Sequence, residues 1–439
     1  MPGPVQPART TNPYLALISI ILGASLLQLA NSLFVALLPL RLALAGDTPL
    51  LAGLAAGAYG IGFLFGCMRI AKIIQTVGHI RTFAALASSC AILSLVFIIA
   101  ELPWLWLPLR FGMGFCLAGL FITAEGWMSA ATAKEIRGSV ISFYLLATKA
   151  ATIIGQVALA LGNINGVMFF ALCAGLFSAA LIPVALTRQQ QPNPPSNRRF
   201  NLADLYRLAP AAVVGTVASG MINGAVMNLA PAWGAGQGLA IGLIVLLLAM
   251  MQVGSLVLQW PLGWLSDHLD RRFLIIGCTV GVTLLSWLVA TLPDAPSTVR
   301  LIVLFLLLGG LSMSFYGICI AHAADFAEPD QMIKVSSGLL FAWAMGSTIG
   351  PVIAGPWMSW LGPSGLFMFV GLTAAVITLF IAYRRTQRQP VPPQNRPGFV
   401  NLPATSPRLA EIDPRRTDQK GPDQRRSDQN GHERGADDI

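Results

Sequence analysis

Residues 239–272 read LAIGLIVLLLAMMQVGSLVLQWPLGWLSDHLDRR, an apolar run that ends in a charged segment. Residues 239–262 contain no charged side chain. An α-helix rises about 1.5 Å per residue, so roughly 20 apolar residues cross the hydrocarbon core of a bilayer. The stretch therefore predicts a transmembrane helix followed by a charged loop.

The same pattern recurs along most of the chain. The predicted spans are 14–38, 50–70, 81–100, 104–130, 138–160, 166–187, 208–231, 239–262, 273–292, 299–323, 335–360 and 364–383. Apolar types make up 55% of the 439 residues and charged types 11%, whereas a soluble domain carries about 25% charged residues. This composition excludes a soluble globule and a disordered chain, and it leaves little room for a soluble catalytic domain. We predict an all-α membrane protein with twelve transmembrane helices.

Basic residues in the loops predict the orientation. With the N-terminus inside, the inner loops hold twelve Lys and Arg residues and the outer loops hold two, Arg41 and Arg300. Basic loops stay on the cytoplasmic side of a membrane. We therefore expect a multi-pass protein of the cell inner membrane with both termini in the cytoplasm. The net charge of +9 is explained by this pattern, so it indicates contact with the lipid bilayer and not with nucleic acid.

A Pro-rich polar segment divides the membrane region. Residues 188–207 contain QQQPNPPSNRR and are predicted to form a cytoplasmic linker between a six-helix half in 1–187 and another in 208–383. Residues 384–439 carry 11 basic and 8 acidic residues and cannot bury a core, so we expect a disordered cytoplasmic tail.

The two halves share spaced residues. Three positions of the first half recur 192 residues later: Asn31 and Asn223, Pro39 and Pro231, and Gly46 and Gly238. Several matches at one offset indicate duplication of a six-helix unit, which gives two bundles related by a pseudo-two-fold axis. Parallel repeats around a central cavity are a transporter architecture.

The charged loop after the eighth span carries a motif. Residues 263–272, GWLSDHLDRR, resemble the GxLxDRxGRR signature of the major facilitator superfamily. Four of the matching residues, Gly263, Asp267, Arg271 and Arg272, would form a conformational latch, because the glycine lets helices approach and the arginines can bridge to a neighbouring helix. The alternative is a plain basic anchor. The copy after the second span has Gln75 in place of the acid, so a latch there is in doubt.

Four further segments carry a more specific resemblance. LLPLR after the first span, GHIRTF after the second, EGWMSA ending the fourth and GSTIGP in the eleventh are similar to the YcaD-like branch of this superfamily, over roughly residues 14–383. The resemblance implies the major facilitator fold and a secondary transporter that works by alternating access. It leaves the substrate open.

Ionisable residues inside spans are the candidates for proton coupling. Such a residue costs roughly 2.5–3.5 kcal/mol unless it has a partner or a watery cavity. Arg110, Glu125 and Lys149 lie in spans four and five. We hypothesise that Glu125 carries the coupling proton and that Lys149 or Arg110 tunes it or receives an anionic substrate group; the alternative is a structural ion pair. His322 and Asp325, at the end of span ten, are further candidates, because alignment of the halves places His322 opposite Glu125.

Amide and aromatic side chains in the spans are the candidates for substrate binding. They are Gln28, Asn31, Gln156, Asn223, Asn228, Tyr144, Tyr316 and Trp343. Asn31 and Asn223 could each bind substrate or link helices. Amides and aromatic rings with few charges suit an uncharged or weakly charged heteroaromatic solute, and uptake of a vitamin such as riboflavin would fit. Efflux of drugs or other toxic molecules is the alternative, because uptake and efflux use the same fold.

Other classes of function find little support. The chain has no GxxxxGK[ST], HExxH or GxSxG motif, so we expect neither ATP-driven transport nor an enzyme, and no cofactor or metal. A non-transporting receptor or scaffold is disfavoured by the paired repeat. We expect a monomer whose partners are a small-molecule substrate and protons.

Overall fold

The computed structural model describes residues 13–100, 102–132, 136–185, 202–292, 297–327 and 331–387, together with Phe399. Its helices are α1 (Pro13–Leu44), α2 (Pro49–Val77), α3 (His79–Ile99), η1 (Pro103–Leu105), α4 (Trp106–Ala131), α5 (Arg137–Ala158), η3 (Leu159–Leu161), α6 (Met168–Ala185), α7 (Leu202–Leu208), α8 (Pro210–Gly236), α9 (Ile241–His268), α10 (Arg271–Ala290), α11 (Thr298–Ala324), α12 (Met332–Leu361) and α13 (Gly365–Gln387). Within the described ranges, twelve of them are long and apolar enough to cross a membrane. The protein is therefore an all-α, multi-pass membrane protein, as its sequence predicts.

Differences from the predicted spans are confined to helix ends and to one short helix. α1 continues past residue 38 to Leu44, and α2 continues past residue 70 to Val77. α7 forms where the linker 188–207 is predicted, with Asp204 in its first turn and Arg207 in its last, the arrangement that the helix dipole favours. The rest of the linker, residues 1–12 and all of the predicted tail except 384–387 and Phe399 lie outside the described residues.

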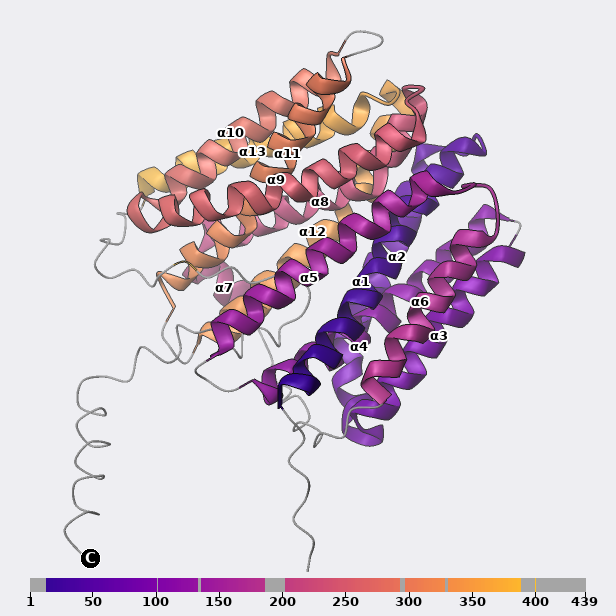
Figure 1. Ribbon diagram of the computed structural model, residues 1–439. Helices are drawn as coiled ribbons and strands as arrows, with labels where there is room; N and C mark the ends of the chain where they lie inside the picture. Colours follow the sequence, from indigo (N-terminus) through magenta and orange to yellow (C-terminus); the bar gives the residue numbers. More distant parts are fainter. Residues whose placement is uncertain are drawn as a thin grey trace, which may run out of the picture.

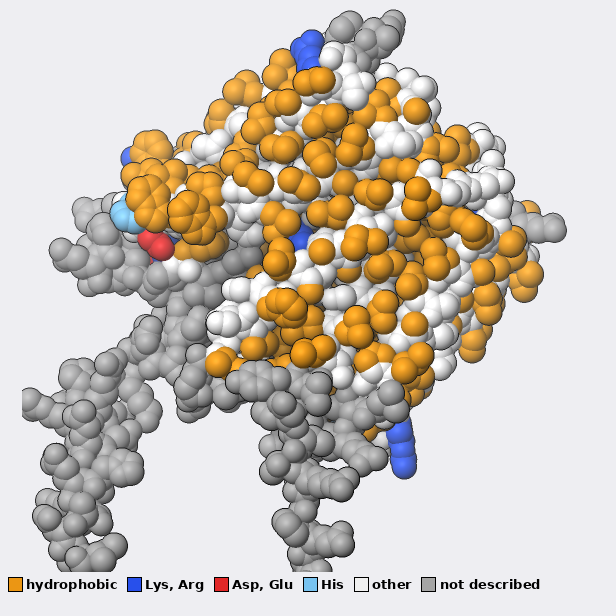
Figure 2. Space-filling view, viewed as in Figure 1, with side chains coloured by type: hydrophobic (Ala, Val, Ile, Leu, Met, Phe, Trp, Pro, Cys, Tyr) orange, Lys and Arg blue, Asp and Glu red, His pale blue; other side chains and the backbone are white. Residues whose placement is uncertain are grey.

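Apolar side chains dominate the outer surface. Figure 2 shows them spread over the long helices, while the charged side chains visible there lie mainly at the two ends of the molecule. Large apolar side chains such as Leu161, Trp260 and Trp360 are among the most exposed. A soluble protein rarely exposes so much contiguous apolar area, whereas a bilayer covers it.

The two halves have the same internal packing (Figure 1). In the N-terminal half (α1–α6), α1 contacts α5 and α6, α3 contacts α4 and α6, and α2 contacts α4. In the C-terminal half (α8–α13), α8 contacts α12 and α13, α10 contacts α11 and α13, and α9 contacts α11. The matching turns after α1 and α8 contain Gly46 and Gly238, with φ of 81° and 68°. This left-handed conformation favours glycine, so the repeat in the sequence is also a repeat in backbone geometry.

The halves meet through α2 against α12 and α5 against α9, and α1 also contacts α8. Glycines permit the closest approach of α2 and α12. A Cβ atom at Gly53 would lie 3.2 Å from the carbonyl carbon of Pro351, and one at Gly60 would lie 3.0 Å from the Cα atom of Thr348. Because Gly53 lies just after the α1–α2 turn, the halves are packed together at the end of the molecule that carries this turn and the α8–α9 turn. A small cavity of about 180 Å³, lined by Asp47 and Ala232 among others, lies at this closed end.

Candidate functional site

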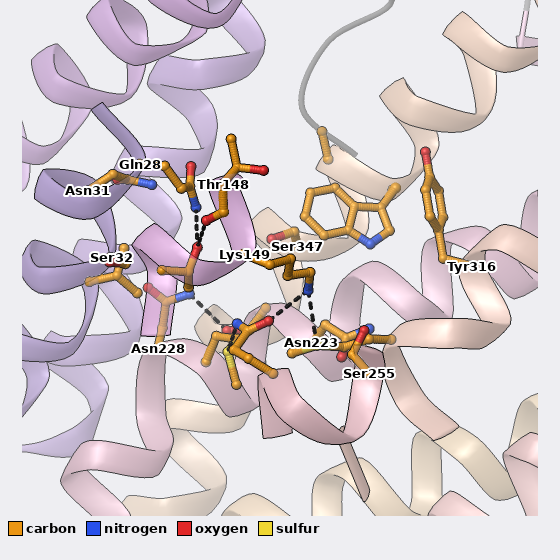
Figure 3. Close-up of a pocket in the computed structure, with 18 of the residues that line it drawn as sticks. Gln28, Asn31, Ser32, Thr148, Lys149, Asn223, Asn228, Ser255, Tyr316 and Ser347 are labelled. Carbon is orange, nitrogen blue, oxygen red and sulfur yellow. Dashed lines mark hydrogen bonds between the residues drawn. The ribbon is translucent and has the colours of Figure 1, made fainter. Parts of the chain in front are cut away.

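A cavity of about 360 Å³ lies between the two halves, within the range of roughly 300–1,000 Å³ that is usual for small-molecule sites. Both halves contribute to its wall. All eight predicted substrate-binding residues line it: Gln28, Asn31, Tyr144, Gln156, Asn223, Asn228, Tyr316 and Trp343. Of the predicted proton-coupling residues, Lys149 lines the cavity. Figure 3 shows Lys149 between the polar side chains of α1 and Tyr316 on α11.

One side of α5 supplies much of the polar wall. Tyr144, Thr148, Thr152 and Gln156 follow one another at four-residue spacing, so they share a face of the helix. The Thr148 and Thr152 hydroxyls donate to carbonyl oxygens of their own helix, at 2.8 Å to Tyr144 and 2.9 Å to Thr148. Gln28 Nε2 on α1 donates to Thr152 Oγ1 at 3.1 Å. The threonines are thus held in place within a polar strip that faces the cavity.

Lys149 reaches across the cavity to the other half. Its Nζ atom donates to Gln252 Oε1 on α9 at 2.7 Å and lies 4.0 Å from Met313 Sδ on α11. Gln252 is buried, and its Nε2 atom donates to Met227 Sδ at 3.6 Å. Instead of the structural ion pair that the sequence leaves as the alternative, Lys149 bonds a neutral amide of the opposite half.

The symmetry-related asparagines have different surroundings. Asn223 Nδ2 donates to the carbonyl oxygen of Ser312 at 2.8 Å, and Asn223 Oδ1 accepts from Ser312 Oγ at 3.0 Å. These bonds tie α8 to α11. Asn31 Oδ1 is buried and has no hydrogen-bond partner among the described residues. Asn223 thus links α8 to α11 while it also lines the cavity, and the buried Asn31 Oδ1 atom is an unpaired acceptor.

Aromatic rings form the opposite wall. The rings of Tyr316 on α11 and Trp343 on α12 lie 6.0 Å apart at 55°. Tyr59 and Phe63 on α2 add rings from the N-terminal half. A planar ligand could stack against these rings.

Glu125 lies directly behind the cavity wall. It is fully buried on α4, and its Oε1 atom accepts a hydrogen bond of 2.6 Å from the hydroxyl of Tyr144. This distance falls in the range of roughly 2.5–2.7 Å for hydroxyl-to-carboxylate bonds. Since Tyr144 lines the cavity, one side chain separates the buried carboxyl group from the cavity.

Arg110 is also one layer behind the wall. It is buried near the start of α4, and its guanidinium carbon lies 4.5 Å from the centre of the Tyr59 ring. Its Nε and Nη1 atoms have no hydrogen-bond partner among the described residues. Cation–π contact with Tyr59 and Phe34 (5.8 Å) stabilises the charge in place of an anion.

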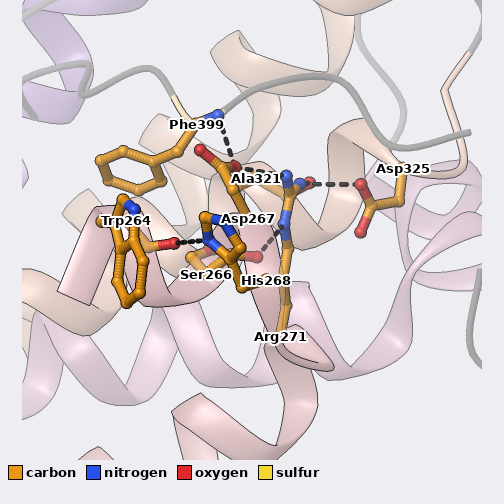
Figure 4. Close-up of polar contacts among 8 residues, drawn as sticks. All are labelled: Trp264, Ser266, Asp267, His268, Arg271, Ala321, Asp325 and Phe399. Atoms are coloured by element: carbon orange, nitrogen blue, oxygen red, sulfur yellow. Dashed lines mark hydrogen bonds and ion pairs between the residues drawn. The ribbon is translucent and has the colours of Figure 1, made fainter. Parts of the chain in front are cut away.

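The motif loop forms an ion-pair network at the end of α9 (Figure 4). Arg271 Nη1 bonds Asp325 Oδ1 at 2.7 Å and also donates to the carbonyl oxygen of Ala321, while Arg271 Nη2 lies 3.4 Å from Asp267 Oδ1. Arg271 thereby connects α9, α10 and α11. Asp325, predicted as a coupling residue, lies in this network, away from the cavity lining.

Asp270 caps the start of α10. Its carboxylate accepts from the backbone N–H of Arg272 at 3.0 Å and from Arg272 Nη2 at 3.0 Å. Burial acts to raise the pKa of Asp270, but the hydrogen bonds and charge of Arg272, with the charge of His322, outweigh it and lower this pKa below its ordinary value. His322 is buried on α11, with its ring against Phe326 at 5.3 Å. His322 therefore lies beside the motif loop and not in the cavity lining.

One residue of the C-terminal segment contacts the motif loop. The backbone N–H of Phe399 donates to Asp267 Oδ1 at 2.8 Å. Its ring lies over Gly263, where an added Cβ atom would come within 2.7 Å of it. Gly263 thus leaves room for an aromatic ring beside the signature aspartate.

Sequence reasoning missed Gln252 and Tyr59. Gln252 is a lone amide within the apolar run LLLAMMQVGS of α9, and that isolation is a signal. Tyr59 is one aromatic residue among many in the spans, and nothing in its local sequence distinguishes it. Only the packing of α2 against α4 shows that it lies between Arg110 and the cavity.

Comparison with known proteins agrees with this architecture. The profile of the Major Facilitator Superfamily matches residues 212–417. An uncharacterized MFS-type transporter of Enterobacter sp. (strain 638) is 25% identical over 374 residues, which cover 84% of this chain and 96% of that protein. The uncharacterized MFS-type transporter YcaD of Salmonella enteritidis PT4 (strain P125109) is 25% identical over 376 residues, with the same coverage.

Solved transporters share the fold. The nucleoside transporter NupG superposes with a TM-score of 0.70 at 11% identity, covering 84% of this chain and 98% of that one. A bacterial homolog of the human lysosomal transporter Spinster, crystallised in an inward-facing and occupied conformation, gives a TM-score of 0.70 at 14% identity, covering 88% and 99%. The family profile, the YcaD relatives and the twelve-helix architecture agree, and together they support a secondary transporter of the major facilitator superfamily and not an enzyme.

Proposed function

We propose that the protein is a proton-coupled transporter that moves a small organic solute across the inner membrane, with Glu125 as the proton site. One observation carries the proposal: Tyr144 lines the cavity and donates to Glu125 Oε1 at 2.6 Å. When Glu125 is ionised, its carboxylate accepts the hydrogen bond from the Tyr144 hydroxyl. When Glu125 is protonated, its own O–H can donate, and the Tyr144 hydroxyl is released to bond a ligand. Proton binding and substrate binding are thereby linked through one side chain.

Movement of the two halves would provide alternating access. The charge distribution in the loops supports cytoplasmic termini, so the closed end at Gly53 would face outward and the cavity would open to the cytoplasm. In this proposal Arg271, Asp267 and Asp325 act as the latch that keeps α9, α10 and α11 together during the movement. We propose that a single chain completes this cycle as a monomer.

The cavity wall favours a planar substrate with hydrogen-bond donors. Asn31 and Gln156 line the cavity, and their amide oxygens are buried without a partner among the described residues. A side-chain rotation would let these oxygens accept from ring N–H groups of a ligand. Tyr316 and Trp343 offer aromatic faces. Uptake of a heteroaromatic, vitamin-like metabolite of the riboflavin kind fits this wall. Efflux of toxic aromatic compounds is the second candidate, since the same aromatic wall would accept them.

The test uses purified full-length protein in proteoliposomes with a pH gradient. The vesicles are incubated with a cell metabolite extract, and untargeted mass spectrometry identifies the solutes that accumulate. We expect accumulation that requires the gradient, with the favourable sign of the gradient distinguishing symport from antiport. Glu125→Gln is expected to abolish gradient-driven accumulation, and Tyr144→Phe to weaken it.

Asp204→Asn is the matched control, because it makes a similar acid-to-amide change on the exposed side of α7. It is expected to accumulate solute like the wild type. Size-exclusion chromatography and thermal unfolding establish that each variant is folded. Undiminished gradient-driven accumulation by a folded Glu125→Gln variant would contradict the proposed proton site.

A further inference from the structure

The cavity contains a positive charge without a negative one. Lys149 is the sole charged residue among those that line it, and its Nζ atom contacts the neutral Gln252 Oε1 at 2.7 Å and Met313 Sδ at 4.0 Å. The three ion pairs found among the described residues all lie in the motif loop of α9–α11. Lys149 therefore lacks an acidic partner within the part of the chain that the structure describes.

A second positive charge lies behind the same wall. Arg110 stacks on the Tyr59 ring at 4.5 Å, and Tyr59 lines the cavity. Two of the buried guanidinium nitrogen atoms have no hydrogen-bond partner among the described residues. Charges of one sign in a low-dielectric wall add to a field that attracts the opposite sign into the cavity.

The ammonium group of Lys149 is partly buried within a membrane-spanning helix, where a charge is unfavourable unless an anion or water compensates for it. Gln252 satisfies one of its three N–H donors without neutralising its charge. A ligand carboxylate could accept from the remaining donors and supply the missing charge. A neutral ligand of the same shape could not.

We infer that the substrate is an organic anion, an aromatic carboxylate whose carboxylate group binds Lys149 Nζ and whose ring lies against Tyr316 and Trp343. This inference rests on the proposed transport function and narrows its heteroaromatic substrates to carboxylates, so a neutral vitamin such as riboflavin gives way to an acidic one. Lys149 and the ring pair line the same cavity, on α5 in one half and on α11 and α12 in the other. The bound anion would thus contact both halves, as a substrate that controls their closure must.

The test measures equilibrium binding to the purified full-length protein in lipid nanodiscs at constant pH. The probes are matched acid and amide pairs: benzoate and benzamide, nicotinate and nicotinamide, and indole-3-acetate and indole-3-acetamide. We expect at least one acid to bind about tenfold or more tightly than its amide, the effect of one hydrogen bond to a charged group. Lys149→Met is expected to remove this preference, and Lys149→Arg to retain it.

Lys334→Met is the matched control, because it makes the same substitution at an exposed position of α12 outside the cavity. It should keep the preference for the acid. The inference fails if no acid in the panel binds more tightly than its amide, or if a folded Lys149→Met variant keeps the preference. Since binding at constant pH needs no proton gradient, either result leaves the role proposed for Glu125 untouched.

Discussion

Asn31 and Asn223 show what a repeated residue does and does not predict. Their common offset identifies both as functional candidates, and both line the cavity. Yet both the amide nitrogen and the amide oxygen of Asn223 are hydrogen-bonded, to Ser219 and Ser312, whereas the amide oxygen of Asn31 is unpaired. The sequence could not separate the two roles, because Ser312 is 89 residues away from Asn223 and becomes a partner only through the packing of α8 on α11.

The asymmetry predicts different costs for the same substitution. Asn223→Ala removes the bonds between α8 and α11 and leaves the Ser312 hydroxyl without its acceptor, so we expect a loss of about 1–2 kcal/mol in the free energy of unfolding. Asn31→Ala removes an unpaired acceptor oxygen and the amide's hydrogen bond with Tyr59, so it should cost less than Asn223→Ala, about 0.5 kcal/mol. Thermal and denaturant unfolding in detergent would measure both. Equal losses for the two variants would show that the bonds of Asn223 add no stability.

At the level of elements, hydropathy located the helices well and their polar contacts poorly. The run 239–262 contains no charge, and it indeed forms the body of α9. The four-residue spacing from Tyr144 to Gln156 likewise places one face of α5 on the cavity. However, nothing in the spacing shows that Lys149 meets Gln252 on α9, because that contact depends on how the two halves dock. Periodicity predicts which face of a helix is polar, and tertiary packing decides what that face contacts.

The cap of α10 gives a prediction that depends on pH. Asp270 is ionised when it accepts from Arg272, and its lowered pKa means that the folded state holds its proton less tightly than the unfolded state. Its stabilisation is therefore complete above the unfolded value of about 3.9 and is lost as the pH falls through the lower folded value. Asp270→Ala should cost about 1 kcal/mol at pH 7, and the cost should shrink in strong acid. Asp270→Asn, which keeps a capping oxygen, should cost less.

The measurement is the difference in thermal unfolding between each variant and the wild type, followed from neutral to acidic pH in the same detergent. Comparing variants at each pH removes the effect of acid on the rest of the protein. A destabilisation by Asp270→Ala that stayed constant down to the lowest pH would show that the carboxylate charge contributes nothing to the cap.

At the scale of the whole molecule, the two halves are joined at one end by backbone contact between α2 and α12. Alternating access requires that this contact open. Gly53 and Gly60 allow it to form, because any side chain at Gly53 would meet the backbone of Pro351 and Gly355. The sequence predicted two equivalent halves from the offset of 192 residues, but not which ends of the helices touch, since both conformations of a rocking transporter share one sequence. A bulky residue at Gly53 should therefore bias the balance between conformations without changing either half.

Gly53→Val is expected to open the closed end. The added side chain overlaps α12, and overpacking of this kind costs about 1–3 kcal/mol, which would increase the population of the open conformation about fivefold or more. Ala232, buried on α8 at the small cavity of that end, provides the reporter as Ala232→Cys in a background with the six native cysteines replaced. Maleimide labelling in nanodiscs should become faster in Gly53→Val.

Gly175→Val on α6 is the control, because an added Cβ atom there meets nothing within 4 Å, and it should label at the original rate. If Gly53→Val also labels at that rate while remaining folded, the α2–α12 contact is not what holds this end closed.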